Sequence, residues 1–140
     1  MLVRERAEMG AAATAVWDVV GDFRGLIEAM IEGTGGRVEV EGEGVGALRT
    51  VTLGTDVLVE RLEDQDDAAW RTTYSMLVTG PFPVTGYRST IELTPAGRDR
   101  CELEWTGTFE PAGVDDDVAD AAVRGVYTGA IAMLHRRFGA

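Results

Sequence analysis

The spacing of apolar residues predicts one long helix at the end of the chain. Between Val114 and Phe138, apolar residues recur at intervals of three and four, as in a helix with one buried face. Aspartates precede this segment and the cations His135 to Arg137 end it, which suits the two ends of a helix dipole. Part of the apolar face consists of small residues, namely Ala122, Gly125, Val126, Gly129 and Ala130. Small residues either bring a helix close to its partner or leave room for another molecule, and close packing is the simpler expectation.

The rest of the chain predicts two short helices and a series of strands. Leu2 to Met9 alternates and predicts the first strand, and Thr14 is a candidate N-cap for a helix that ends at Val20. Phe23 to Glu32 predicts the second short helix. Further strands are expected near residues 37–42, 46–53, 56–64, 69–78, 84–94 and 100–110. Short turns rich in glycine, proline and aspartate separate them, which predicts an antiparallel meander.

This order of elements predicts an α+β fold that contains a cavity. An antiparallel sheet accompanied by one long helix must bury one of its faces against that helix. Strongly twisted strands curl around the helix, and one helix cannot fill the whole concave side. We therefore expect a single domain over residues 1–140, in which a curved seven-stranded sheet wraps the C-terminal helix and the two short helices close one end of the cavity.

Composition narrows the classes of function. The chain of 140 residues has a net charge of −11 and no basic cluster beyond Arg136 and Arg137, which argues against nucleic acid and anionic membrane surfaces as partners. All thirteen cationic residues are arginine, so no lysine can form a Schiff base. Cys101 is the only cysteine, which excludes an internal disulfide. Because no apolar run approaches about 18 residues and charges begin at Arg4, we expect a cytoplasmic protein without a signal peptide or membrane insertion.

Several short stretches together carry a family resemblance. These stretches are Ala15–Phe23, Gly44–Arg49, Val59–Leu62, Tyr87–Thr90, Glu104–Trp105 and Pro111–Gly113. In order and spacing they resemble the helix-grip, START-like superfamily, specifically the small bacterial polyketide cyclase/dehydrase-type (SRPBCC) proteins. The layout from Val45 onward is also similar to that of the plant abscisic-acid receptors. The resemblance implies a seven-stranded sheet that grips the C-terminal helix around a ligand cavity. It implies no single activity, because the superfamily includes cyclases, dehydratases, hydrolases, lipid carriers and hormone receptors.

Matching positions imply which residues line this cavity. The resemblance places there Glu60, Tyr74, Met76, Tyr87, Ser89, Glu104, Ala122, Val126 and Ala130. For Glu104 the resemblance conflicts with the alternation of its strand, which would turn Leu103 and Trp105 inward instead.

The sequence also departs from these relatives around the cavity. The loops Leu53–Asp56 and Thr79–Val84 match the receptors' gate and latch in position, but the latch sequence differs, which argues against a hormone-type switch. The receptors' pocket lysine has no counterpart, which disfavours a carboxylate ligand. The segment Gly25–Ile31 lacks the Trp and His-Pro pair of many bacterial relatives, so the entrance is expected to be more aliphatic.

Glu60 is the main catalytic candidate, because it interrupts an otherwise apolar strand. Burial at the cavity would favour its neutral form and suit it to general acid–base work, with Tyr87 as the candidate partner. The alternatives are a structural ion pair with Arg49 or Arg61, or a carboxylate that faces outward. Arg49 could also bind a ligand oxygen. Tyr74 and Tyr87 could donate hydrogen bonds to a ligand or simply pack in the core.

Other kinds of catalytic site find no support in the sequence. His135 is the only histidine and is expected to face solvent at the end of the long helix, so no Ser–His–Asp or Cys–His arrangement is predicted. No spaced set of His, Cys, Asp and Glu indicates a metal site, and no cofactor is expected.

Three functions follow from this reading. The first is binding of a hydrophobic small molecule, either aromatic or polycyclic or lipid-like, in an internal cavity. The second is an enzyme of the polyketide cyclase or dehydratase kind, in which Glu60 and a tyrosine transfer protons. The third is a protein-interaction or regulatory module whose cavity has collapsed. We also consider a homodimer.

Overall fold

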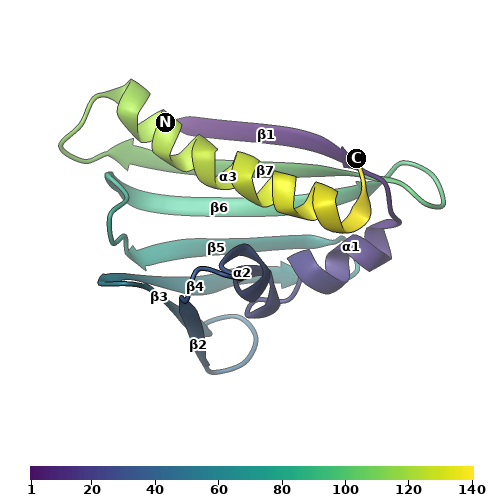
Figure 1. Ribbon diagram of the computed structural model, residues 1–140, viewed down its shortest axis with the longest axis horizontal. Helices are drawn as coiled ribbons and strands as arrows, with labels where there is room; N and C mark the ends of the chain where they lie inside the picture. Colours follow the sequence, from purple (N-terminus) through teal and green to yellow (C-terminus); the bar gives the residue numbers. More distant parts are fainter.

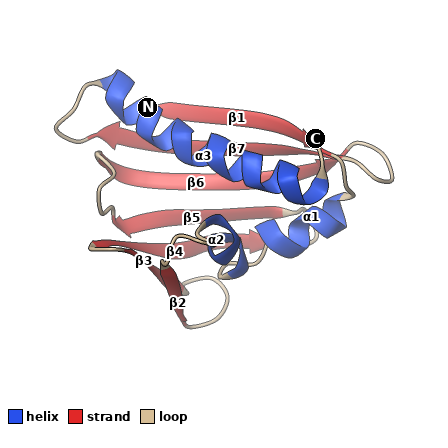
Figure 2. Ribbon diagram, viewed as in Figure 1, coloured by secondary structure: helices blue, strands red, loops and turns tan.

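The computed structural model describes residues 1–140 as a curved sheet with three helices on one face (Figures 1 and 2). The strands form one seven-stranded antiparallel sheet in the order β1-β7-β6-β5-β4-β3-β2. The strands are β1 (Leu2–Met9), β2 (Arg37–Glu41), β3 (Leu48–Leu53), β4 (Asp56–Asp66), β5 (Arg71–Val78), β6 (Val84–Pro95) and β7 (Cys101–Pro111), and the helices are α1 (Ala13–Val20), α2 (Gly25–Met30) and α3 (Asp116–Phe138). The predicted helix-grip layout is confirmed. None of the helices is long and apolar enough to cross a membrane.

Alternation along β7 shows how the sheet acquires one apolar face. Leu103, Trp105 and Phe109 are buried beneath the helices, whereas Glu102 and Glu110 are exposed on the other face. Irregularities in register bend the sheet, and they lie between Val59 and Glu60, between Leu62 and Asp64, and between Thr85 and Arg88. Such irregularities increase the local twist of a strand, and the resulting curvature carries β4, β3 and β2 away from α3.

The long helix α3 packs against β1 and β7, and its N-terminal turn carries Asp116 and Asp117 (Figure 1). Its buried residues are Ala119, Val123, Tyr127, Ala130, Ile131 and Leu134. Gly107 of β7 makes the close approach of the helix possible, because a Cβ atom at this position would overlap the hydroxyl of Tyr127. A glycine in the sheet, rather than a glycine in the helix, therefore sets the distance between the two layers here.

The two short helices differ from their predicted limits. Helix α1 begins at Ala13 with Ala12 at its N-cap, so Thr14 is an exposed residue of the first turn and not the cap. Helix α2 is shorter than predicted, because the carboxylate of Asp22 accepts hydrogen bonds from the backbone N–H groups of Arg24 and Gly25, at 3.2 and 2.9 Å. This turn ends the connection between the helices, and α2 starts only after it.

The sheet divides into two halves that are covered differently. We call β1, β7 and β6 the covered half, because α3 lies across them, and we call β4, β3 and β2 the open half (Figure 1). The main core of 21 buried residues joins α3 and α1 to the covered half and extends to Tyr74 of β5. A separate cluster of four buried residues joins α2 to the open half, and its members are Ile27, Val38, Val51 and Leu58. The candidate site lies between these two cores.

Candidate functional site

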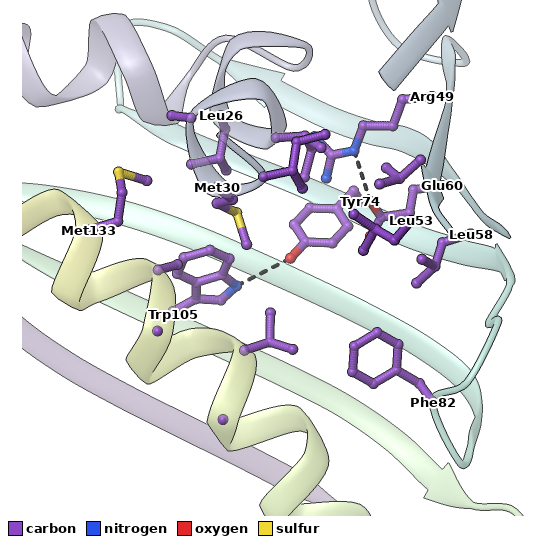
Figure 3. A pocket seen from close by; sticks show the side chains of 18 of the residues that line it. Leu26, Met30, Arg49, Leu53, Leu58, Glu60, Tyr74, Phe82, Trp105 and Met133 are labelled. Carbon is purple, nitrogen blue, oxygen red and sulfur yellow. Dashed lines mark hydrogen bonds and ion pairs between the residues drawn. The ribbon is translucent and has the colours of Figure 1, made fainter. Parts of the chain in front are cut away.

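A pocket of about 720 Å³ lies between α2, α3 and strands β3 to β5. It is lined by 26 residues, of which 18 are hydrophobic, so its walls are mainly apolar. Figure 3 shows Leu26 and Met30 of α2 facing Met133 of α3 across one side, with Leu58 and Phe82 toward the other side. The volume lies within the usual range of ligand sites in proteins, about 300 to 1,000 Å³.

Two glycines of α3 leave space in this pocket. A Cβ atom added at Gly125 or Gly129 would meet no other atom within 4 Å, and both residues line the pocket. The expectation of close helix–sheet packing is therefore wrong for these two positions. Each glycine costs helix stability, by about 1 kcal/mol relative to alanine, and the room that it leaves is used by the pocket.

A buried ion pair forms the polar side of the pocket. The Nε atom of Arg49 donates a hydrogen bond of 2.9 Å to Oε1 of Glu60, and the two residues are 2% and 6% exposed. Arg49 also donates to the backbone carbonyl of Phe23 at 2.7 Å. Its guanidinium lies over the rings of Phe23 and Tyr74, at 4.2 and 4.7 Å from their centroids. Arg49 thus ties the α1–α2 connection to the open half of the sheet.

The ion pair leaves one carboxylate oxygen of Glu60 without a partner in the protein. Only Oε1 of Glu60 is bonded to Arg49, and the pocket includes Glu60 among its lining residues. Among the fully buried side-chain nitrogen and oxygen atoms, only Oε1 of Gln65 lacks a hydrogen-bond partner, and it lies elsewhere in the fold. Oε2 of Glu60 is thus not one of the fully buried atoms. Oε2 of Glu60 is therefore open to the pocket and can accept a hydrogen bond from a molecule bound there.

A network of hydroxyl groups lies under α3, beside the ion pair. The Trp105 Nε1–H group donates to Ser89 Oγ at 2.9 Å. It donates more weakly to the Tyr74 hydroxyl at 3.3 Å, as Figure 3 shows. The Tyr127 hydroxyl is hydrogen-bonded to Ser89 Oγ at 3.0 Å and to the Tyr87 hydroxyl. The network therefore fixes the orientation of the three tyrosines and of Trp105, and it spans β5, β6, β7 and α3.

Burial holds these tyrosines in their neutral form. Desolvation is the main reason why the pKa of Tyr74 is raised, and the negative charge of Glu60 adds to the effect. Desolvation likewise raises the pKa of Tyr87 well above its ordinary value and also raises that of Tyr127. All three hydroxyls are therefore protonated at neutral pH. The Tyr74 hydroxyl accepts from Trp105, so its own proton can be donated to a ligand.

The structure brings most of the predicted residues to the pocket. Seven of them line it, namely Arg49, Glu60, Tyr74, Met76, Tyr87, Val126 and Ala130. Ser89 lies behind the wall, in the hydroxyl network, and Ala122 of α3 is not among the lining residues.

Glu104 does not line the pocket, so the position implied by the family resemblance is wrong. Its carboxylate lies on the outer face of β7 and receives a hydrogen bond of 2.6 Å from Arg6 of β1. Trp105, the next residue, is 1% exposed and points inward, as the alternation of the strand predicts. The strand has no bulge at this point that would reverse the alternation.

Several residues of the site were missed by sequence reasoning. Trp105, Met133, Arg136 and Arg137 line the pocket, and Tyr127 joins the hydroxyl network. Met133, Arg136 and Arg137 follow Gly129 at spacings of four, seven and eight, so continuing that helical stripe to the C-terminus would have found them.

His135 is half-buried at the end of α3 and also contacts β1. One of its ring nitrogens is 2.8 Å from the backbone oxygen of Glu8, which places the ring between α3 and the edge strand. The structure contains no cluster of three or more His, Cys, Asp or Glu side chains arranged to hold a metal ion.

The fold is that of a helix-grip protein, and a mainly apolar pocket lies between its sheet and its helices. The chain belongs to the family described as polyketide cyclase / dehydrase and lipid transport, whose sequence profile matches residues 2–139. The family, the fold and the pocket support a role in ligand binding or cyclisation. No curated protein that was compared matches the chain.

Solved structures similar to this chain include proteins of different activity. XoxI from Bacillus cereus is 28% identical, with a TM-score of 0.86, over 98% of this chain and 94% of that one. The ZhuI aromatase/cyclase from Streptomyces sp. R1128 is 21% identical, with a TM-score of 0.76, over 96% and 90%. Norcoclaurine synthase from Thalictrum flavum, solved in complex with dopamine and hydroxybenzaldehyde, is 19% identical, with a TM-score of 0.74, over 98% and 87%. The last two similarities establish a shared fold.

Proposed function

We propose that the protein binds a hydrophobic small molecule, either aromatic or polycyclic or lipid-like, in the pocket between α3 and the open half of the sheet. The observation that carries this proposal is the pocket of about 720 Å³, in which 18 of 26 lining residues are hydrophobic. Two pocket-lining glycines in a long helix support it, because they lower helix stability and a Cβ atom there would meet no other atom within 4 Å.

The polar groups of the pocket define how such a molecule would be oriented. They gather on one side, where Glu60 Oε2 can accept a hydrogen bond and the Tyr74 hydroxyl can donate one. A bound molecule would therefore place a hydroxyl, phenol or carbonyl group against this side. Its apolar body would lie against Leu26 and Met30 of α2 and the glycines of α3.

Binding can be tested by native mass spectrometry and by a neutral fluorescent probe. Protein purified gently from its own host is expected to carry a reproducible extra mass that is lost on denaturation. N-phenyl-1-naphthylamine is expected to bind the wild type with a blue-shifted emission. Gly125→Leu would fill the pocket and weaken probe binding, whereas Ala121→Leu, one turn earlier at an exposed position outside the pocket, would not. Equal binding by the two variants would place the probe elsewhere, and no bound mass together with no probe binding would refute the proposal.

A second candidate is a cyclase or dehydratase, and the open oxygen of Glu60 favours it. Glu60 Oε2 could accept a proton from a carbon next to a carbonyl group, while a tyrosine hydroxyl donates its proton to the carbonyl oxygen. Tyr74 is better placed than Tyr87 for this role, because Tyr74 lies against the Arg49 guanidinium whereas the Tyr87 hydroxyl is bonded to Tyr127. The pocket would hold the reacting chain folded.

The enzyme hypothesis has its own test. Glu60→Gln should abolish turnover of a compound found in the pocket while its affinity remains, and Glu63→Gln is a matched control because Glu63 lies on the same strand and bonds Arg61 and Ser75 instead. Unchanged turnover in Glu60→Gln would remove Glu60 from the mechanism. The hypothesis of an interaction module required a collapsed cavity, and a pocket of about 720 Å³ contradicts that condition. The homodimer and the cytoplasmic location stay predictions.

A further inference from the structure

Two arginines at the end of α3 lie where the pocket meets solvent. Arg136 and Arg137 are exposed, and both line the pocket. Nine of the thirteen arginines form ion pairs with carboxylates, but these two form none and make no side-chain hydrogen bond in the protein. The helix dipole explains why cations are favourable in the last turn. The dipole does not explain why neither Arg136 nor Arg137 has an acidic partner at the mouth of the pocket, although the chain is rich in carboxylates.

The charge of the pocket is opposite to that of the whole chain. Three arginines and two glutamates line the pocket, which gives it a net charge of +1, whereas the chain has a net charge of −11. Arg49 and Glu60 neutralise each other at the sheet side. At the mouth, Glu32 is the one acidic residue against two arginines, and it forms no ion pair with either. The mouth is therefore the part of the pocket that attracts an anion.

A continuous stripe of α3 connects the interior of the pocket to these arginines. Gly125, Gly129 and Met133 follow one another at intervals of four, and Arg136 and Arg137 continue the same face. From Gly125 to Arg137 the helix rises by twelve steps, which is about 18 Å at 1.5 Å per residue. An extended apolar chain or a fused ring system of that length can lie along it.

We propose that the ligand is amphipathic, with its apolar body along this stripe and an anionic group, a carboxylate or a phosphate ester, held at the mouth by Arg136 and Arg137. This inference rests on the proposed function as a binding protein and adds the class and direction of its ligand. The absence of a lysine in the pocket argues against a carboxylate only at the inner end, on the side of the sheet. The positive charge of Arg136 and Arg137 instead places the anionic group at the mouth. The inner end, near Glu60 and Tyr74, would receive an uncharged polar group.

The test compares probes that differ only in the head group. Dodecanoate, dodecyl phosphate and 1-dodecanol would each compete with N-phenyl-1-naphthylamine, at concentrations below the micelle range. In the wild type, at least one of the two anions is expected to bind about tenfold more tightly than the alcohol, since each exposed charge contact contributes modestly. The preference should fall when the ionic strength is raised from about 0.05 M to about 0.5 M. Comparing dodecanoate with dodecyl phosphate distinguishes the two sources of the anion.

Charge variants then locate the anion. In the double variant Arg136→Gln and Arg137→Gln, the preference for anions should disappear while the affinity for 1-dodecanol is unchanged. The double variant Arg4→Gln and Arg98→Gln changes the net charge equally at exposed positions outside the pocket, and it should keep the preference. Equal affinities of anions and alcohol in the wild type, or a preference that survives in the first double variant, would overturn this inference and leave the proposed function intact. If N-phenyl-1-naphthylamine bound but none of the three probes displaced it, this inference would fail and the proposed function would stand. If the dye did not bind and no bound mass was found, both would fail.

Discussion

The covered and open halves of the sheet are built from similar strands but held together in different ways. In the covered half, α3 contacts β1 and β7, and its buried face joins a continuous core of 21 residues. In the open half only the short helix α2 approaches the sheet, and four residues form the separate core there. Where the covering helix is close, the concave side is filled; where the sheet curves away from it, the pocket remains.

Each half also has its own polar anchor. The covered half contains the hydroxyl network, in which Ser89 and Tyr127 are enclosed and bonded to one another. The open half contains the Arg49–Glu60 pair, which fixes the α1–α2 connection to the sheet through the carbonyl of Phe23. The difference indicates that neutral groups serve packing in one half, whereas a charged pair supports the wall of a pocket in the other. Variants in the two halves test this contrast.

The same truncation should cost more in the covered half than in the open half. Leu103 of β7 is fully enclosed in the main core, whereas Leu58 of β4 lines the pocket. Leu103→Ala leaves a new cavity and is expected to lower the free energy of unfolding by about 4 kcal/mol. Leu58→Ala enlarges a space that exists already and should cost about 2 kcal/mol. Urea denaturation of both variants measures the difference, and equal losses would mean that the pocket is as well packed as the core.

Breaking the ion pair of the open half should destabilise the protein more than breaking a surface pair. Arg49→Met leaves the Glu60 carboxylate without its partner, with an expected loss of about 3 kcal/mol. Arg37→Met removes the exposed pair with Glu39 on β2 and should cost at most about 1 kcal/mol. The double variant Arg49→Met and Glu60→Leu should recover much of the loss, because no uncompensated charge remains.

The comparison of these variants separates two explanations. If the double variant were as unstable as Arg49→Met alone, the loss would come from the contacts of Arg49 with Phe23 and Tyr74 and not from the charge of Glu60. The same denaturation experiments decide between them.

Removing one hydroxyl from the covered half should have an intermediate effect that depends on pH. Tyr127→Phe breaks two buried hydrogen bonds and is expected to cost about 2 kcal/mol at neutral pH. Because the folded-state pKa of Tyr127 is raised, the unfolded chain loses its proton first as the pH rises through about 10, and the stabilisation from the neutral hydroxyl is then lost. The wild type should therefore lose stability progressively as the pH rises above about 10, and Tyr127→Phe should lose it less steeply.

Tyr74 and Tyr87 remain in that variant and act in the same direction, so the slope should become smaller but not vanish. An alkaline slope identical in the wild type and Tyr127→Phe would show that Tyr127 ionises as readily in the folded protein as in the unfolded chain.

Local patterns predicted the elements well because each strand carries its own signals. Glycine, proline and aspartate mark the turns, and the alternation in β7 correctly turned Trp105 inward and Glu104 outward. The position that the family resemblance implied for Glu104 was wrong, since a match between distant relatives cannot override the alternation of an unbroken strand. The start of α1 was also wrong, because Thr14 follows the first helical residue and makes no cap.

The chemistry of the pocket was only partly accessible to the sequence. A lone glutamate in an apolar strand was enough to single out Glu60, with Arg49 or Arg61 as its alternative ion-pair partners. The structure selects Arg49, which is paired with Glu60 across adjacent strands. The arginines at the mouth could not be assigned in this way, since only the curvature of the sheet brings the end of α3 beside α2. Gly125 and Gly129 were ambiguous for a similar reason: helical spacing shows which face they share but not what that face meets.

The smallest effect is expected at Gly129 of α3, and the same substitution at Gly107 of β7 should have the opposite sign. Gly129→Ala in α3 adds a methyl group that meets no atom within 4 Å and should raise the free energy of unfolding by about 1 kcal/mol, because alanine favours the helix. Gly107→Ala in β7 places its methyl group against the Tyr127 hydroxyl and should lower stability by about 1 to 3 kcal/mol. Thermal and urea denaturation of both variants give the two signs. If Gly129→Ala were also destabilising, the space beside α3 would be occupied in solution, and saturating the wild type with a ligand would then be expected to stabilise it more than the variant.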